Sequence, residues 1–111
     1  MSLLPPSTND DYQGSVAAAW FLVLVGALTL APGLIHFFLP DGGAGTIAGI
    51  DLSQRGQTIV AIFAWFGALQ IPHGIAELAV GLRYRTLVPL FLLLVILERA
   101  LMALDGWVLK G

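Results

Sequence analysis

The fold is decided by the stretch Gly67-Ala-Leu-Gln70-Ile-Pro72-His73-Gly74-Ile-Ala-Glu77-Leu-Ala-Val-Gly81-Leu-Arg83. At about 100° per residue, its small and polar residues share one narrow helix face and its apolar residues occupy the opposite face. A helix surrounded by lipid must turn such a face toward protein, a water-filled cavity or a ligand, because unpaired polar groups in hydrocarbon cost several kcal/mol. The small and polar face consists of Gly67, Gln70, Gly74, Glu77 and Gly81, with His73 at its edge.

The composition is that of a membrane protein. Hydrophobic residues make up 58% of the 111 residues and charged residues only 11%, which is too little charge to cover a soluble domain of this length. A net charge of −2 without a basic patch argues against a nucleic-acid partner. Cysteine is absent, so the chain has no disulfide, thiolate metal site or cysteine nucleophile.

We therefore expect an all-α, polytopic membrane protein with three transmembrane helices in one bundle. A proline-containing polar arm precedes a single transmembrane helical domain, and one glycine-rich loop joins the first two spans. The expected boundaries are 1–14 for the arm, 15–111 for the domain, about 15–39, 54–82 and 87–108 for the spans, and 40–53 for the loop.

Prolines and capping residues refine these boundaries. Pro72 predicts a kink in the second helix, because proline has no backbone N–H and leaves the carbonyl of Ala68 without its donor. Asn9 or Asp10 could cap the start of the first helix, and Ser53 the start of the second. The glycines of the loop could offer backbone amides to an anion, but a flexible connection is the simpler interpretation.

The connection between the second and third spans sets the expected orientation. Arg83 and Arg85 make it the most basic short loop, which the positive-inside rule places in the cytoplasm together with the N-terminus. Arg55 and Lys110 oppose this assignment. We expect a multi-pass protein of the cell inner membrane with a cytoplasmic N-terminus.

His73 and Glu77 lie one helical turn apart, so their side chains can meet. Imidazole and carboxylate together can bind a divalent metal or transfer a proton, and His36, Glu98 or Asp105 could add a ligand from another helix. The paired Glu-x-x-His motifs of helical di-metal sites are absent, so His36, His73 and Glu77 are weak metal candidates. His36 and His73 could instead form an axial pair for haem if they share a depth.

Glu98 and Arg99 interrupt the third apolar span, with Asp105 two turns after Glu98. Charges within a membrane are costly unless they are paired, so these residues and Glu77 are interpreted first as interhelical ion pairs. A proton or ion relay through Glu77 and Glu98 is the functional alternative, and Arg99 could extend toward the interface.

Two classes of function follow from these residues. The glycines at 67, 74 and 81 permit close helix packing and favour a non-enzymatic helical subunit of a homo- or hetero-oligomeric membrane complex. The alternative is a proton- or ion-coupled carrier, or a haem- or quinone-binding membrane anchor of a respiratory or photosynthetic complex. Its candidate ligand- or proton-binding residues are Gln70, His73, Glu77, Glu98 and Arg99, with lipid, haem or quinone as the candidate ligands.

The order of features also resembles a known kind of family. A first span with a late proline, Arg55-Gly56 opening a glycine-bearing helix, a basic connection, Glu98-Arg99 and a late Asp105-Gly106 are similar to small uncharacterised bacterial inner-membrane proteins grouped as a domain of unknown function. The resemblance covers most of the chain after Gly26. It implies a bacterial membrane protein and supplies no site residues.

Overall fold

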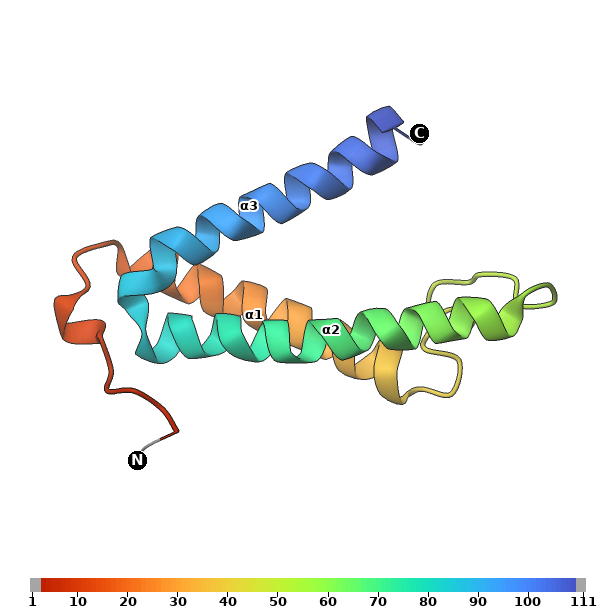
Figure 1. Ribbon diagram of the computed structural model, residues 1–111, viewed down its shortest axis with the longest axis horizontal. Coiled ribbons are helices and arrows are strands. Elements are labelled where there is room, and N and C mark those ends of the chain that lie inside the picture. Colours follow the sequence, from red (N-terminus) through yellow and green to blue (C-terminus); the bar gives the residue numbers. More distant parts are fainter. Residues whose placement is uncertain (1–2, 110–111) are drawn as a thin grey trace.

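The computed structural model describes residues 3–109, which form helices joined by two connections (Figure 1). Three α-helices dominate this described part: α1 (Val16–Phe38), α2 (Gly56–Arg83) and α3 (Val88–Leu104). Short 3-10 turns, η1 (Asn9–Asp11) and η2 (Arg85–Leu87), precede α1 and α3, and α3 continues as one π-helical segment, η3 (Asp105–Leu109).

The prediction of an all-helical chain with three long apolar helices is confirmed. The three candidate spans, Val16–Phe38, Gly56–Arg83 and Arg85–Leu109, have 23, 28 and 25 residues. At 1.5 Å per residue each is long enough to cross a hydrocarbon core of about 30 Å, and each is apolar enough to do so.

The helices form an antiparallel pair with a third helix that diverges from it. Figure 1 shows α1 and α2 side by side, whereas α3 leaves them at an angle from the end where it begins. At that end the buried core is made by α1, α2 and the first residue of α3, and Phe91, Leu92 and Val95 pack against it. The core residues are Ala19, Leu22, Val80 and Val88.

Small residues set the distance between α1 and α2. A Cβ added to Gly67 would lie 2.6 Å from the carbonyl oxygen of Gly33, and one added to Gly74 would lie 3.0 Å from that of Gly26. At Gly81 the corresponding distance to the carbonyl oxygen of Ala19 is 3.0 Å. The three glycines of α2 thus meet three small residues of α1 at the same spacing in antiparallel order, which lets the backbones touch.

Both α1 and α2 contain a proline and continue through it. Pro32 lies inside α1 and Pro72 inside α2, without an interruption of either helix. Proline lacks the N–H that would bond four residues back, and a membrane helix tolerates this loss when neighbours support it.

The two helix starts differ from the predicted ones. Ser15, and neither Asn9 nor Asp10, caps α1, since its Oγ accepts the N–H of Ala18 at 3.2 Å. α2 is preceded by Arg55 in the left-handed conformation, with φ of 55°, and no side chain caps it. Ser53 was a wrong prediction for this cap, because α2 begins at Gly56 and Arg55, not Ser53, occupies the residue before it.

The N-terminal arm is tied to the turn between α2 and α3. Asn9 Nδ2 donates to the Leu82 carbonyl at 2.8 Å, and Ser7 Oγ donates to the Arg83 carbonyl at 2.8 Å. In return, Asn9 Oδ1 accepts the N–H of Arg85 at 3.1 Å. The last carbonyls of a helix have no partner within it, so the arm caps the C-terminus of α2.

The glycine-rich loop is organised by its own aspartate. The Asp41 carboxylate accepts the backbone N–H groups of Gly43, Gly45 and Thr46 at 2.8, 3.2 and 2.8 Å. These bonds, first that of Gly43 and then that of Thr46, hold the pKa of Asp41 below its ordinary value. The amides that could have been offered to an external anion therefore bind a carboxylate of the chain itself.

Candidate functional site

The small and polar face of α2 is divided between two environments. Gly67, Gly74 and Gly81 are buried against α1 and Glu77 is also buried, whereas Gln70 is partly buried and His73 is exposed. The glycines therefore pack within one chain, and the polar residues at the edge of the face lie next to the space from which α3 diverges. α1 thus supplies the protein cover that the glycines of this face require.

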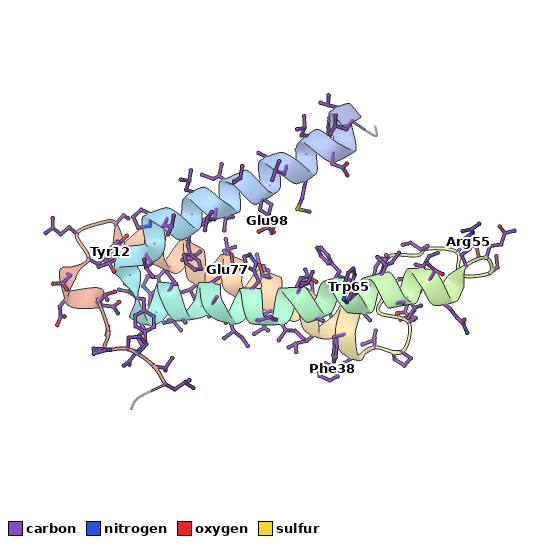
Figure 2. The ribbon with its side chains drawn as sticks, viewed as in Figure 1. Tyr12, Phe38, Arg55, Trp65, Glu77 and Glu98 are labelled. Atoms are coloured by element: carbon purple, nitrogen blue, oxygen red, sulfur yellow. The ribbon has the colours of Figure 1, made fainter. Side chains whose placement is uncertain are left out.

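His73 connects α2 to α3. Its Nε2 lies 3.2 Å from Glu98 Oε2 and 4.0 Å from Glu77 Oε1. Figure 2 shows Glu98 extending from α3 toward α2, on the side where Glu77 lies. The pair of carboxylates predicted from the sequence is thus brought together around one imidazole.

Glu77 is the most deeply buried ionisable residue of this group. Its exposed fraction is 1%, against 45% and 42% for the side chains of His73 and Glu98. Glu77 Oε1 has no hydrogen-bond partner, and neither has the buried Oε1 of Gln70. Buried acceptors without donors are rare in proteins, so these two oxygens call for a physical explanation.

A cavity of about 460 Å³ lies beside these groups, between α3 and the α1/α2 pair. All three helices line it. Its polar end carries Gln70, His73, Glu98 and Arg99, and its apolar wall includes Phe66 and Met102. A cavity of this size, with mostly apolar walls and a few convergent polar groups, is of the kind that binds small molecules.

Glu98 and Arg99 both border this cavity, although adjacent residues of a helix point in different directions. Successive helical positions differ by about 100°, so the two side chains reach its edge from different sides. Arg99 is exposed, and within the described residues no hydrogen bond or ion pair involves it. Of the candidates, Gln70, His73, Glu98 and Arg99 line this cavity, whereas Glu77 does not, although its Oε1 lies 4.0 Å from His73 Nε2.

The residues of α1 that line this cavity were not among the predicted site residues. Thr29 is a buried polar residue whose hydroxyl donates to the Val25 carbonyl at 2.8 Å, and it lines the cavity together with Leu28 and Pro32. A threonine isolated in an apolar span was the available signal. Its position opposite α3 could not be derived without knowing how the helices pack.

His36 does not join the site. Its Nδ1 lies 2.7 Å from the Gly42 carbonyl, and its ring meets Phe63 edge-on with centroids 5.1 Å apart. Since Gly33 faces Gly67 in the antiparallel pair, His36 and His73 lie on opposite sides of that level, about 13 Å apart along the axis. The chain therefore does not bring the two histidines together as an axial pair for one haem.

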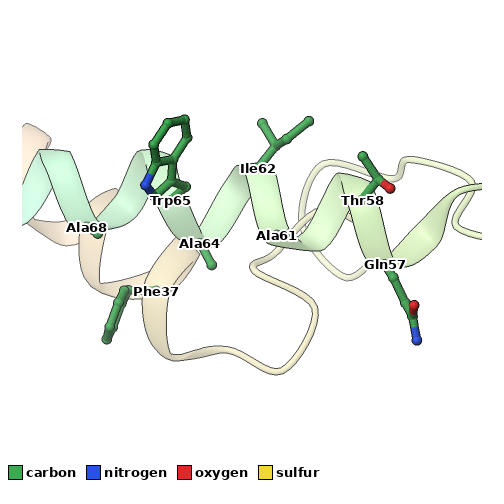
Figure 3. A pocket seen from close by; sticks show the side chains of 8 residues that line it. All are labelled: Phe37, Gln57, Thr58, Ala61, Ile62, Ala64, Trp65 and Ala68. Carbon is green, nitrogen blue, oxygen red and sulfur yellow. The ribbon is translucent and has the colours of Figure 1, made fainter.

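A second hollow, of about 700 Å³, lies on the outer side of the first half of α2. In Figure 3, Trp65 and Ile62 point to one side of α2 and Gln57 to the other, so the side chains do not converge. It contains no ionisable residue. Its apolar surface is that expected of a helix side that faces lipid.

Among residues 3–109, no group of three or more His, Asp or Glu side chains is arranged to hold a metal ion. Comparison with known proteins adds nothing to this site, since no family model, curated protein or solved structure matches the chain. The chemistry of the cavity must therefore be inferred from its own residues.

Proposed function

We propose that the protein is a helical subunit of a homo- or hetero-oligomeric membrane complex, and that the divergent half of α3 contacts another subunit. Three helices of sufficient length and hydropathy support a multi-pass arrangement. The resemblance noted above and the positive charge at Arg83 and Arg85 support a bacterial inner membrane with the N-terminus in the cytoplasm.

The observation that carries the proposal is the lack of packing along the second half of α3. Its first half packs against the core through Val88 and Val95. From residue 96 to residue 109, every residue is exposed except Glu98, which is partly buried. Three helices that separate in this way leave an incomplete bundle.

Arg99 adds an electrostatic argument. It lies near the middle of the span Arg85–Leu109, exposed at the edge of the cavity between α3 and the α1/α2 pair. An arginine at the centre of a membrane helix costs about 2.5 to 3.5 kcal/mol on insertion scales, and such residues face protein or a water-filled cavity. A neighbouring subunit on this side of α3 would cover Arg99 and complete the bundle.

Pro72 has a place in this proposal. With no N–H at Pro72, the Ala68 carbonyl lacks its helical donor, and we propose that α2 bends there. A bend close to His73 would adjust the separation between α2 and α3 when the additional subunit binds.

Cysteine cross-linking in the native membrane tests the subunit assignment, and the absence of natural cysteine makes single-cysteine variants clean. Leu101→Cys and Ile62→Cys are a matched pair, since each residue is 57% exposed, the first on the divergent half of α3 and the second on α2. We expect the first variant to cross-link to a second copy or to a companion subunit, and the second variant to remain uncross-linked. A monomeric mass in mild detergent and no cross-link at Leu101 would contradict the proposal.

A proton- or ion-coupled carrier is the second candidate, favoured by Glu77, whose Oε1 is buried without a partner. Its test is Glu77→Gln, which keeps size and removes the charge. Loss of proton-linked transport in vesicles with unchanged assembly would support a carrier, whereas unchanged transport would exclude Glu77 from the role.

A further inference from the structure

Glu98 and Arg99 flank the face of α3 that is directed toward α1 and α2. Both residues line the cavity between α3 and the α1/α2 pair, and so does Met102. At about 100° per residue, Met102 falls between the other two around the helix. This face of the divergent half of α3 therefore carries a carboxylate on one flank, a guanidinium on the other and an apolar side chain between them.

Arg99 has no acidic partner within its own chain. The ion pairs of the described residues join His73 to Glu77 and to Glu98, and none includes Arg99. Glu98 precedes Arg99 directly, so the two side chains leave the helix about 100° apart. Glu77 is 1% exposed and does not line the cavity. An arginine within a membrane span pairs with an acceptor or faces water, so an acceptor for Arg99 has to come from outside the chain.

Glu98 can accept a further donor. Its Oε2 lies 3.2 Å from His73 Nε2, and no hydrogen bond to its Oε1 is found among residues 3–109. A carboxylate has about four acceptor positions, so one imidazole N–H leaves most of them open. The side chain is 42% exposed and borders the cavity, where a guanidinium from outside can reach it.

The charges that line the cavity cancel in sum, although they do not pair with each other. A protein that covers them has to bring a cation to Glu98 and an acid to Arg99 at nearly the same depth in the membrane. A second copy inserted in the same orientation brings both, because its own Glu98 and Arg99 are separated by about 1.5 Å along α3. In two parallel helices, residues on opposite flanks of the contact face each other, as the e and g positions of a coiled coil do.

We propose that the divergent half of α3 from a second copy of this chain occupies the cavity, and that Arg99 of each copy pairs with Glu98 of the other. The inference rests on the proposed function and specifies it: the additional subunit is a second copy, and the contact is two-fold symmetric. It covers residues 96–109, which are exposed apart from the partly buried Glu98. The apolar wall of the cavity, which includes Phe66 and Leu69, receives the apolar side chains of the second α3.

Two cysteine variants test which molecule occupies the cavity. Met102→Cys places a thiol between the two charged flanks, and Leu97→Cys places one about 140° away around α3, on the side turned from the cavity. They are a matched pair, since the native side chains are 51% and 52% exposed. After oxidation of the full-length protein in native membranes, we expect Met102→Cys to form a disulfide-linked dimer of this chain and Leu97→Cys to remain monomeric.

Charge variants on two differently tagged copies test the pairing itself. Arg99→Gln and Glu98→Gln are co-expressed, each together with Met102→Cys. A pair of two Arg99→Gln copies has no guanidinium and a pair of two Glu98→Gln copies has no carboxylate at the contact, whereas a mixed pair keeps one Arg99–Glu98 contact. We therefore expect mixed dimers to exceed the random proportion by about tenfold relative to like dimers, the effect of one charged hydrogen bond away from water.

Arg99→Gln co-expressed with Glu77→Gln is the matched control. Glu77 undergoes the same chemical change but lies outside the cavity, so mixed dimers should form in the random proportion. An excess of mixed dimers here would assign Arg99 to Glu77 and overturn the proposal, as would the random proportion for Arg99→Gln with Glu98→Gln. Circular dichroism and elution volume identify any charge variant that fails to fold, and the comparison of Met102→Cys with Leu97→Cys does not depend on these variants.

Other occupants of the cavity give other results. A disulfide from Met102→Cys to a different chain would show that a companion subunit fills the cavity, and a monomeric Met102→Cys beside a cross-linked Leu101→Cys would show a small molecule or lipid there. Either result overturns this inference and leaves the subunit proposal intact. If neither Met102→Cys nor Leu101→Cys cross-links and the mass in mild detergent is that of one chain, both proposals fail.

Discussion

Gly74 of α2 faces Gly26 of α1 so closely that a Cβ added to Gly74 would lie 3.0 Å from the Gly26 carbonyl oxygen and 2.8 Å from the backbone nitrogen of Leu30. Backbone atoms cannot rotate away as the end of a flexible side chain can. The two helices would have to separate to admit even a methyl group. This contact is therefore a direct test of the α1/α2 pair.

We predict that Gly74→Ala destabilises the protein. Overpacking costs about 1 to 3 kcal/mol and the higher helix propensity of alanine returns about 1 kcal/mol, so we expect a net loss of up to about 2 kcal/mol. Thermal unfolding followed by circular dichroism in detergent should show a lower Tm. Gly106→Ala is the control, since a Cβ there meets nothing within 4 Å, and its Tm should be equal to or slightly higher than that of the unaltered protein. Equal Tm values for both variants would show that α1 and α2 do not pack in this way.

The sequence predicts the α2 side of this helix pair but not the α1 side. The spacing of Gly67, Gly74 and Gly81 predicts a face for close packing, but it does not identify the partner. On α1, Ala19, Gly26 and Gly33 have the same spacing, and they supply that partner. The equal spacing of the two sets, which match in antiparallel order, was the signal that could have identified α1 as the partner of this face.

The capping of the C-terminus of α2 by the N-terminal arm could not be predicted from spacing in the sequence. The polar arm was expected to be a short extension, yet Asn9 binds both Leu82 and Arg85, more than seventy residues further along the chain. Such bonds depend on where the end of α2 lies in space. The position of Glu98 shows the same limit, because a helix period gives its direction on α3 but not the angle at which α3 diverges from α2.

Asn9→Ala tests the bond between the arm and the end of α2. The change removes the donor to the Leu82 carbonyl and the acceptor for the N–H of Arg85, so we expect a loss of about 1 to 2 kcal/mol of unfolding free energy. Urea or thermal unfolding in detergent measures it, and limited proteolysis should cleave the released arm faster. Asp10→Ala, an exposed position in the same 3-10 turn, provides the comparison. If the two variants unfold alike, the arm does not stabilise this end of the bundle.

Asp41 gives the loop a defined pH dependence. Its pKa in the folded protein is lowered, first by the N–H of Gly43 and then by that of Thr46, from an ordinary value of 3.8. The ionised carboxylate therefore stabilises the loop at any pH above its ordinary pKa. This contribution is lost as the pH falls through the lower pKa that Asp41 has in the folded protein. We expect amide-exchange protection at Gly43 and Thr46 to be constant between about pH 6 and pH 4 and to fall at lower pH.

Asp41→Asn separates this effect from general acid unfolding. An amide oxygen is a weaker acceptor than a carboxylate, so the variant should show low protection at Gly43 and Thr46 even near neutral pH. The N–H of Leu39, bound to the Ile35 carbonyl at 3.0 Å, reports on α1 and should stay protected in both proteins. Full protection at Gly43 in the variant would mean that the carboxylate does not organise the loop.

The contact between His73 and Glu98 should control how far α3 diverges from α2. Hydrogen bonds between membrane helices contribute about 0.6 to 1.7 kcal/mol, which changes the ratio of closed to open arrangements by about three- to twentyfold. We therefore predict that His73→Ala shifts the population toward a wider separation. Spin labels on cysteines introduced at Ile75 and Leu104 measure this as a longer or broader distance distribution.

Two further variants identify the nature of the contact. Glu98→Gln keeps an oxygen acceptor for His73 Nε2, whereas Glu98→Leu removes it, so a hydrogen bond predicts an unchanged distribution in the first and a widened one in the second. An ion pair predicts widening in both, because each variant loses the charge. His36 lies at the other end of the α1/α2 pair, beside Gly42, so His36→Ala is the control and should leave the distance distribution unchanged. If His73→Ala also leaves it unchanged, the angle of α3 is set by Val88, Phe91 and their neighbours in the core alone.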